Sequence, residues 1–251
     1  MVKVSVVIIA KNEEQQIREC LESAKWADEI VILDDFSTDK TREIAKEYTN
    51  SIHQRKMDIE GKHRNYAYSL ARNEWVLSID CDERITPELA EEIPKALETN
   101  TEYTAFSIPI RAFLGKRWIR YAGYYPGRKT RLFKKSCFRY EEAEVHPRII
   151  HEGRCGKLNN DILHYSYKSF YDVVNKLNRE TTLEAKKWIQ DRRKVNFLKI
   201  MRKSISRFLK FYFQKKGYKD GFLGFMFSFF HALYQLLSYA SYWELKKGEE
   251  K

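Results

Sequence analysis

The sequence predicts an α/β fold with a mostly parallel sheet, and three observations lead to this prediction. Residues 4–10, 30–33 and 75–79 are nearly continuous apolar runs rich in β-branched side chains, typical of strands covered on both faces. Segments with helical spacing separate the runs, and alternating strands and helices imply right-handed parallel crossovers. Hydrophobic residues make up 43% of the chain, enough for a sizeable core, which excludes global disorder.

Capping residues indicate where the first helices begin. Asn12 is expected to cap a helix after the first strand, and Thr38 or Asp39 a helix after the second. A third helix is expected over residues 62–72. Thr86, which is followed by proline, is expected to cap a fourth.

The second half of the chain has a different pattern of predicted secondary structure. Residues 103–167 form short β-like runs interrupted by glycines, and three helical patterns follow over residues 169–191, 197–214 and 222–245. We therefore expect one domain over residues 1–167, with halves 1–100 and 101–167, and a helical region over residues 168–251.

Charge is distributed unevenly between the two parts of the chain. Residues 1–100 hold 14 basic and 21 acidic side chains, whereas residues 101–251 carry a net charge of +18. This asymmetry indicates that the second part faces an anionic partner. The four cysteines lie far apart without a C-x-x-C pair, which argues against a zinc ribbon or a disulfide scaffold and favours reduced cytoplasmic thiols.

Carboxylates follow the second and third apolar runs, at the strand ends where parallel sheets bind ligands. Asp34 and Asp35 end one run, and Asp80 and Asp82 form a D-x-D pair after the next. Alternate side chains of an extended segment point the same way, so two carboxylates can face one ligand, and hard oxygen ligands favour Mg²⁺ or Mn²⁺. The first sixty residues contain no glycine, which excludes a G-x-G-x-x-G or Walker A loop there.

Four segments carry a resemblance to a known family. The four segments are VSVVIIAKNE (4–13), LDDFSTDKT (33–41), GKHRN (61–65) and IDCDE (79–83). They resemble, in order, the nucleotide-binding segments of family 2 glycosyltransferases, which have the GT-A (Rossmann-like) fold. The second half contains the motifs FLG (113–115), GYYP (123–126), RLF (131–133), VH (145–146) and LHY (163–165). These motifs resemble the lipopolysaccharide-core β-glucosyltransferase subfamily.

The resemblance implies roles for individual residues. Asp35 or Asp34 would read the base of a uridine diphosphate (UDP) sugar, Asp80 would contact the ribose, and Asp82 would hold Mn²⁺ or Mg²⁺. Residues 1–100 would thus form the nucleotide-sugar half and residues 101–167 the acceptor half of a catalytic domain. The implied nucleotide-sugar-binding residues are Ala10, Asn12, Glu13, Asp34, Asp35, Arg64, Asp80 and Arg131.

The catalytic base is left open among several residues of one segment. An inverting transfer needs one group that deprotonates the acceptor hydroxyl. The subfamily pattern ends His-Glu, but here His146 is followed by Pro147. Two histidines are also candidates to complete the metal site beside Asp82, namely His146 and His164. The candidates for the base are Glu144, which we favour, Glu142 and His146, with Glu152 as a further option.

The C-terminal helices indicate a membrane surface. Residues 186–219 contain 13 basic residues and one acid, with apolar side chains at helical spacing from Met201 to Tyr212, typical of a helix lying on an anionic membrane. Residues 221–243 carry no charge and could span a bilayer. A polar stripe from Ser228 to Tyr242 instead favours an in-plane or protein-packed helix. The alternative is a solvated basic face beside a core helix.

These features predict an inverting, metal-dependent transferase that moves a hexose from a UDP-sugar to a lipid-linked saccharide, such as a lipopolysaccharide core or another surface glycolipid. It would act at the cytoplasmic face of the inner (plasma) membrane, as a peripheral or monotopic protein, without a nucleic-acid partner. Two alternatives remain. A sugar nucleotidyltransferase would need a glycine-rich basic loop after the first strand, and a basic membrane- or nucleic-acid-binding protein would leave the acidic strand ends unexplained.

Overall fold

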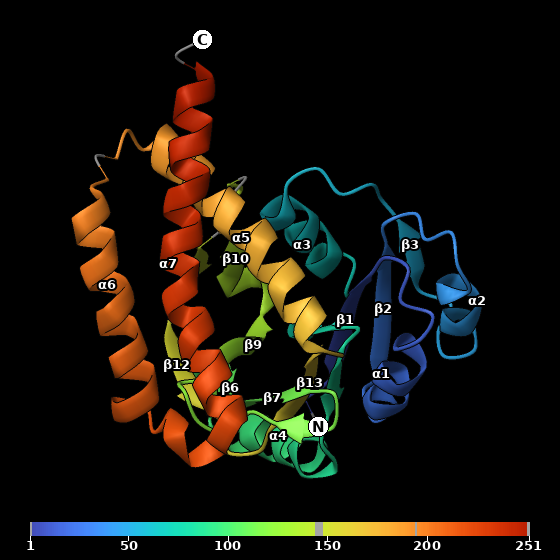
Figure 1. Ribbon diagram of the computed structural model, residues 1–251. Helices are drawn as coiled ribbons and strands as arrows, with labels where there is room; N and C mark the ends of the chain where they lie inside the picture. Colours follow the sequence, from blue (N-terminus) through green and yellow to red (C-terminus); the bar gives the residue numbers. More distant parts are fainter. Residues whose placement is uncertain (1, 144–147, 194, 250–251) are drawn as a thin grey trace. The chain divides into compact units, whose positions relative to one another are not determined.

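The computed structural model describes residues 2–143, 148–193 and 195–249 (Figure 1). The chain divides into two compact units. One unit, which we call the sheet unit, comprises Met1–Ile110 and Gly127–His164, and the other, the helical unit, comprises Arg111–Pro126 and Tyr165–Lys251.

A seven-stranded sheet forms the centre of the sheet unit, in the order β12-β6-β9-β4-β1-β2-β3. Neighbouring strands are parallel except that β9 runs antiparallel to both β4 and β6. The predicted α/β fold with a mostly parallel sheet is therefore confirmed, with one reversed strand near its centre. The strands are β1 (Val4–Ala10), β2 (Glu29–Asp34), β3 (Ile52–Gln54), β4 (Trp75–Asp80), β6 (Tyr103–Ile108), β9 (Lys129–Lys134) and β12 (Arg154–Lys157).

Helices cover both faces of this sheet. On one face, α1 (Ile17–Ala24), α2 (Thr41–Lys46) and α4 (Pro87–Thr99) contribute to one apolar cluster with the side chains of Val4, Val6 and Ile8. On the other face, Ala67 and Tyr68 of α3 (Glu60–Ser69) pack with Val7 and Phe133. Successive residues of β1 thus face opposite layers, which explains why its sequence is apolar throughout.

The structure confirms one predicted cap and corrects another. Thr86 accepts a hydrogen bond from the Leu89 amide at the start of α4, as predicted. The prediction that Asn12 caps α1 was wrong, because α1 begins only at Ile17. Asn12 adopts a left-handed conformation with a φ of 54°, and its side chain accepts a hydrogen bond from the Thr38 amide. Asparagine tolerates this conformation better than most residues, so it shapes the loop instead.

Shorter strands complete the sheet unit. β5 (Glu83–Ile85) pairs antiparallel with the first part of β13 (Ile162–Tyr167), so that Glu83 lies opposite His164. β10 (Phe138–Tyr140), which follows a 3₁₀ turn over Lys135–Cys137, pairs with β11 (Ile149–His151).

The helical unit contains the three C-terminal helices that the sequence predicts. In Figure 1, α7 (Gly221–Glu249) lies between α5 (Phe170–Gln190) and α6 (Phe197–Leu209) and packs against both. A π-helical turn over Lys210–Gln214 and a 3₁₀ turn over Gly217–Asp220 connect α6 to α7. The unit also contains the hairpin of β7 (Ile110–Leu114) and β8 (Arg117–Trp118), and its core includes Leu177, Phe227 and Phe230.

The polar stripe of α7 faces the protein. Ser228, Gln235 and Ser238 are at most 2% exposed, and both serine hydroxyls donate to backbone carbonyls of their own helix. The helical segment Gly217–Lys247 is long and apolar enough to cross a membrane. However, 39% of its most apolar stretch of 18 residues is already buried in the protein. The stripe therefore marks a packing face, which is one of the two arrangements that the sequence favours.

His231 of α7 is expected to make the free energy of unfolding depend on pH. His231 stacks on Phe211 with ring centroids 3.8 Å apart, and burial, reinforced by the charge of Arg207, lowers its pKa to about 4. An unfolded histidine titrates near about 6.5, so the unfolded chain binds more protons between these values. Lowering the pH through this window should therefore reduce the free energy of unfolding, by up to about 3 kcal/mol for full protonation.

Urea unfolding at pH 7.0, 6.0 and 5.0 would measure this effect in the wild-type chain and in His231→Gln. The test does not depend on the stability of the variant at a single pH. The variant should show a smaller change of the free energy of unfolding with pH than the wild-type chain. An unchanged slope of stability against pH would contradict the assignment.

Candidate active site

The predicted acidic residues converge at one edge of the sheet. β4, β1 and β2 are neighbours, and their carboxyl ends carry Asp80, Ala10 and Asp34. The register confirms the alignment, since Ile9 pairs with Asp80 and Ala10 with Asp34. The sheet thus brings together residues that are 70 positions apart in the sequence.

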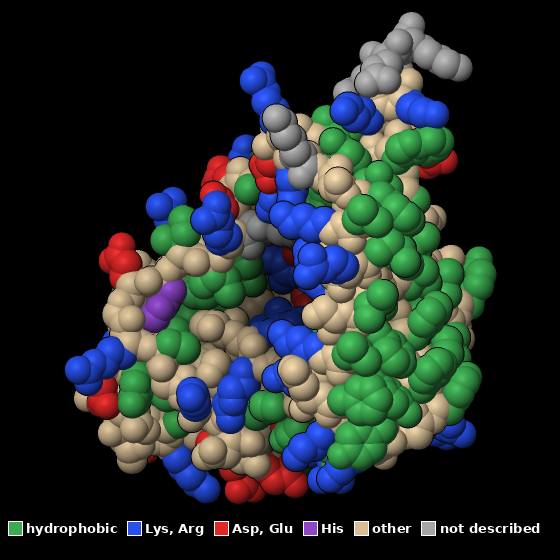
Figure 2. Space-filling model, turned by 60° about the vertical axis from the view of Figure 1, so that its left-hand side comes forward, with side chains coloured by type: hydrophobic (Ala, Val, Ile, Leu, Met, Phe, Trp, Pro, Cys, Tyr) green, Lys and Arg blue, Asp and Glu red, His purple; other side chains and the backbone are tan. Residues whose placement is uncertain are grey.

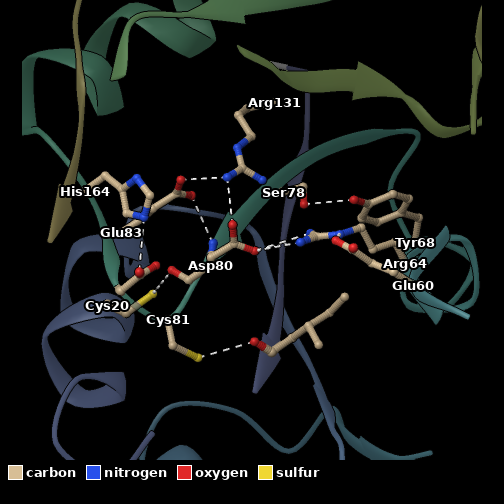
Figure 3. A network of polar contacts seen from close by, with 12 residues as sticks. Cys20, Glu60, Arg64, Tyr68, Ser78, Asp80, Cys81, Glu83, Arg131 and His164 are labelled. Atoms are coloured by element: carbon tan, nitrogen blue, oxygen red, sulfur yellow. Dashed lines mark hydrogen bonds and ion pairs between the residues drawn. The ribbon is translucent and has the colours of Figure 1, made fainter. Parts of the chain in front are cut away.

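Asp80 is the centre of a network of charged groups (Figure 3). Nη1 and Nη2 of Arg64 lie 3.2 and 3.3 Å from its Oδ1, and Nη2 of Arg131 lies 2.8 Å from its Oδ2. The same Nη2 lies 2.6 Å from Oε1 of Glu83, and the Asp80 amide donates to Oε2 of Glu83 at 3.0 Å. Two elements, α3 and β9, therefore hold the carboxylate of Asp80, and a third, β5, holds its backbone amide.

The electrostatics of this network keep Asp80 ionised. Burial opposes the charged form, but the guanidinium groups of Arg131 and Arg64 outweigh it and hold the pKa of Asp80 well below its usual range. Burial likewise opposes the charge of Arg131, yet Glu83 and Asp80 raise its pKa. Asp80 can therefore accept hydrogen bonds from a ligand but cannot exchange a proton near neutral pH.

Asp82 and His164 form the second half of the site. Nε2 of His164 lies 3.1 Å from Oδ2 of Asp82, and the pairing of β13 with β5 accounts for their proximity. The side chain of His164 is 14% exposed and that of Asp82 is 29% exposed, so the pair is partly open to solvent. Carboxylate and imidazole are both ligands of divalent cations.

This donor pair fits part of the coordination sphere of a divalent metal. Among the described residues, no group of three or more histidine, cysteine or acidic side chains is arranged to hold one. Mg²⁺ and Mn²⁺ commonly take one or two protein ligands and complete their sphere with water and substrate phosphates, so two donors suffice for this class of site. His146, the other predicted ligand, lies outside the described residues.

The two aspartates after β2 are both buried. Asp34 is inaccessible and accepts hydrogen bonds from the Ser37 amide and from Gln54. Asp35 is 4% exposed, and Lys11 Nζ lies 2.7 Å from its Oδ2. Burial opposes the charge of Asp35, but the hydrogen bonds to Lys11 and to a backbone amide leave its pKa below the usual value. The structure therefore gives Asp34 a role in shaping the turn and leaves Asp35 nearer to solvent.

Ala10, Asn12 and Glu13, the other predicted residues of the segment 4–13, form hydrogen bonds with the segment that follows β2, mostly through backbone groups. The carbonyl of Ala10 accepts a hydrogen bond from the Asp35 amide, and the Glu13 amide donates to the hydroxyl of Thr41. With the Asn12–Thr38 contact, these bonds fasten the end of β1 to the loop after β2.

The base candidates are described only in part. Glu144 and His146 lie outside the described residues. Glu142 and Glu152 are described and exposed. The identity of the base stays a prediction.

A pocket adjoins the Asp80 network within the sheet unit. Its volume is about 620 Å³, and four of its six charged lining residues are basic. Such a lining suits a substrate that carries phosphate oxygens or sugar hydroxyls. The lining residues are Glu60, Arg64, Asp80, Arg128, Lys129, Thr130, Arg131, Tyr140 and Ile149.

Sequence reasoning missed the part that Glu83 plays. It belongs to the IDCDE motif, but no role was predicted for it. The available signal was an acidic residue directly after the D-x-D pair, at the start of a short strand. Two buried thiols also pack beneath the loop, since Cys20 donates to the Asp80 carbonyl and Cys81 to the Ile9 carbonyl.

Comparison with known proteins connects this site to a family. Residues 5–151 match the model of glycosyl transferase family 2. The chain is 29% identical to a glycosyltransferase of Rickettsia typhi, over 98% of this chain and 88% of the relative. It is 28% identical to the lipopolysaccharide core biosynthesis glycosyltransferase LpsC of Rhizobium meliloti, over 96% of this chain and 92% of the relative.

A solved structure supports the fold. The crystal structure of residues 1–349 of TarS from S. aureus, in complex with UDP, superposes with a TM-score of 0.51 at 16% identity, covering 98% of this chain and 92% of that one. This likeness confirms the GT-A fold predicted from the sequence. Because the family model spans more than half of the chain, including β1, β2, α3 and the D-x-D pair, the protein belongs to glycosyltransferase family 2.

Proposed function

We propose that this glycosyltransferase carries out an inverting, metal-dependent transfer of a hexose from a UDP-sugar to a lipid-linked saccharide, such as a lipopolysaccharide core or another surface glycolipid. The observation that carries the proposal is the pair of carboxylates at the end of β4. Asp80 is an ion held by two arginines, and Asp82 is a half-buried carboxylate beside His164.

The different surroundings of these two aspartates support a division of labour in donor binding. Asp80 remains ionised and can accept a hydrogen bond from a ribose hydroxyl. Asp82 and His164 would hold Mn²⁺ or Mg²⁺, which when bound offsets charge on the leaving diphosphate. UDP bound to TarS, a protein with the same fold, is consistent with a UDP-sugar donor.

The transfer itself requires one general base. The acceptor hydroxyl loses its proton to the base as its oxygen bonds to the anomeric carbon, and the bond from that carbon to the diphosphate breaks with its electron pair leaving on UDP. The segment from Glu142 to Glu152, which contains Glu144 and His146, supplies the candidates. Cationic residues beside Asp80, including Lys129, would attract the diphosphate of the donor.

The surface of α6 supports attachment to an anionic membrane. The buried residues of α6 are Ile200 and Ser204. Several other apolar residues of α6 are therefore not buried against the rest of the protein and stay exposed. Leu198 and Ile205 are 70% and 56% exposed, with Lys199 and other basic residues beside them. Figure 2 shows hydrophobic side chains gathered over the helical unit, on the right of the view.

This arrangement matches a bilayer surface in two respects. Exposed apolar side chains of α6 and α7 can enter the acyl boundary, while the lysines and arginines contact anionic headgroups. The resemblance to LpsC, whose name refers to the lipopolysaccharide core, is consistent with a lipid-linked acceptor at the cytoplasmic face of the inner membrane. The exposed apolar residues are Phe197, Leu198, Ile205, Leu209, Phe213, Phe222, Phe225, Phe229 and Trp243.

A screen for UDP release tests the donor and the metal together. Wild-type protein, incubated with a set of UDP-sugars, Mn²⁺ or Mg²⁺ and a membrane lipid extract, should release UDP with one of them. Asp82→Ala should lower turnover by about 100-fold or more because the metal loses a ligand, while the protein stays folded.

Asp58→Ala, which removes an exposed carboxylate of the same unit, serves as the matched control and should keep full turnover. Release of pyrophosphate in place of UDP would favour the nucleotidyltransferase alternative. Full activity of Asp82→Ala without metal would refute the role of the D-x-D pair.

Sedimentation with vesicles tests the membrane surface. Wild-type protein should bind vesicles containing phosphatidylglycerol far better than vesicles of phosphatidylcholine alone. Ile205→Glu with Leu209→Glu should weaken this binding about tenfold, because two apolar contacts are lost and two like charges approach the lipid.

Lys95→Glu on α4 is the control for a change of charge elsewhere on the protein. Equal binding by the α6 variant would exclude this surface. Stronger retention on DNA than on anionic vesicles at matched salt would favour a nucleic-acid-binding protein.

A further inference from the structure

Glu83 is a fully buried carboxylate whose position in the site calls for an explanation. Its side chain has 0% exposure, and it begins β5 immediately after the D-x-D pair. A charged carboxylate removed from water costs several kcal/mol unless it is paired and hydrogen-bonded. The contacts of Glu83 therefore indicate its role in the site.

Both oxygens of Glu83 act on the same neighbour, Asp80. Oε2 accepts a hydrogen bond from the Asp80 amide at 3.0 Å. Oε1 accepts one from Nη2 of Arg131 at 2.6 Å, and this nitrogen also donates to Oδ2 of Asp80 at 2.8 Å. One carboxylate thus holds the backbone of Asp80 directly and its side chain through Arg131, in a closed ring visible in Figure 3.

Glu83 also balances the charge around Asp80. Arg64 and Arg131 both contact the Asp80 carboxylate, and Arg64 has a second partner in Glu60. Glu83 is the second carboxylate partner of Arg131 and shares its Nη2 with Asp80. Without Glu83, Arg131 would direct its charge at Asp80 and bind the Asp80 oxygens more tightly, which would leave them less available to a ligand hydroxyl.

The Asp82–His164 pair also depends on β5, the strand that Glu83 begins. In the pairing of β5 with β13, Glu83 lies opposite His164, whose imidazole contacts Asp82. The position of Glu83 therefore bears on both members of the D-x-D pair.

We propose that Glu83 is a positioning residue for the donor, which orients Asp80 and keeps its oxygens available for the ribose of the UDP-sugar. This inference rests on the proposed function, since it assumes that Asp80 contacts the nucleotide. Glu83 itself touches no substrate and acts only through Asp80 and Arg131.

The test compares two isosteric changes in the same unit. Glu83→Gln keeps an oxygen that can accept from the Asp80 amide but removes the charge. Glu29→Gln is the matched control, because Glu29 is another buried carboxylate that accepts from Ser5 and pairs with Arg72 at the opposite end of the sheet. Both variants should lose thermal stability, so stability alone does not distinguish them.

The distinguishing measurement is calorimetric titration with UDP in the presence of Mn²⁺, which needs no acceptor. Glu83→Gln should weaken UDP binding about tenfold and raise the KM for the UDP-sugar more than it lowers kcat. Glu29→Gln should bind UDP within about twofold of wild type.

Arg131→Lys provides a second route if Glu83→Gln fails to fold. It keeps the positive charge but loses the planar fork, and it should also weaken UDP binding. Wild-type affinity in Glu83→Gln, or equal losses in Glu83→Gln and Glu29→Gln, would overturn the inference while leaving the proposed function intact. A wild-type chain that binds no UDP would overturn both.

Discussion

The hydrogen bonds from Arg131 to Asp80 and Glu83 are the interaction on which the site depends. A guanidinium that is only 5% exposed meets two carboxylates, and the three groups come from β9, β4 and β5. Neither Arg131 nor Glu83 could remain buried alone, because an unpaired ion in the interior costs far more than any one contact returns. The reversed strand β9, which pairs with β4, brings Arg131 to the D-x-D pair.

This constraint gives the two aspartates different chemistry within three residues of sequence. Asp80 is enclosed by arginines and stays an anion, so it suits recognition of a hydroxyl. Asp82 lies beside a histidine and forms no ion pair with an arginine among the described residues, so it suits a cation. The two carboxylates of this D-x-D pair therefore differ in their partners although they are neighbours in the sequence.

Much of this could be predicted from the sequence, and the reasons are local. The strands β1, β2 and β4 are continuous apolar runs, so their existence and their ends follow from composition. The convergence of Asp34, Asp35 and Asp80 follows from the rule that parallel strands end at one edge. Asn12 was misread because a cap and a left-handed loop residue favour the same side chain. Glu83 received no role because its partner Arg131 is 48 residues away.

The sequence by itself determined the fold class, the acidic edge of the sheet and the division into an acidic and a basic part, since these depend on residue type and spacing. Only the tertiary structure decided that Asp80 is clamped by Arg64 and Arg131, that Asp82 lies against His164, and that the polar stripe of α7 packs inward. These outcomes depend on pairings between distant segments. Local spacing carries no information about which distant charges will meet.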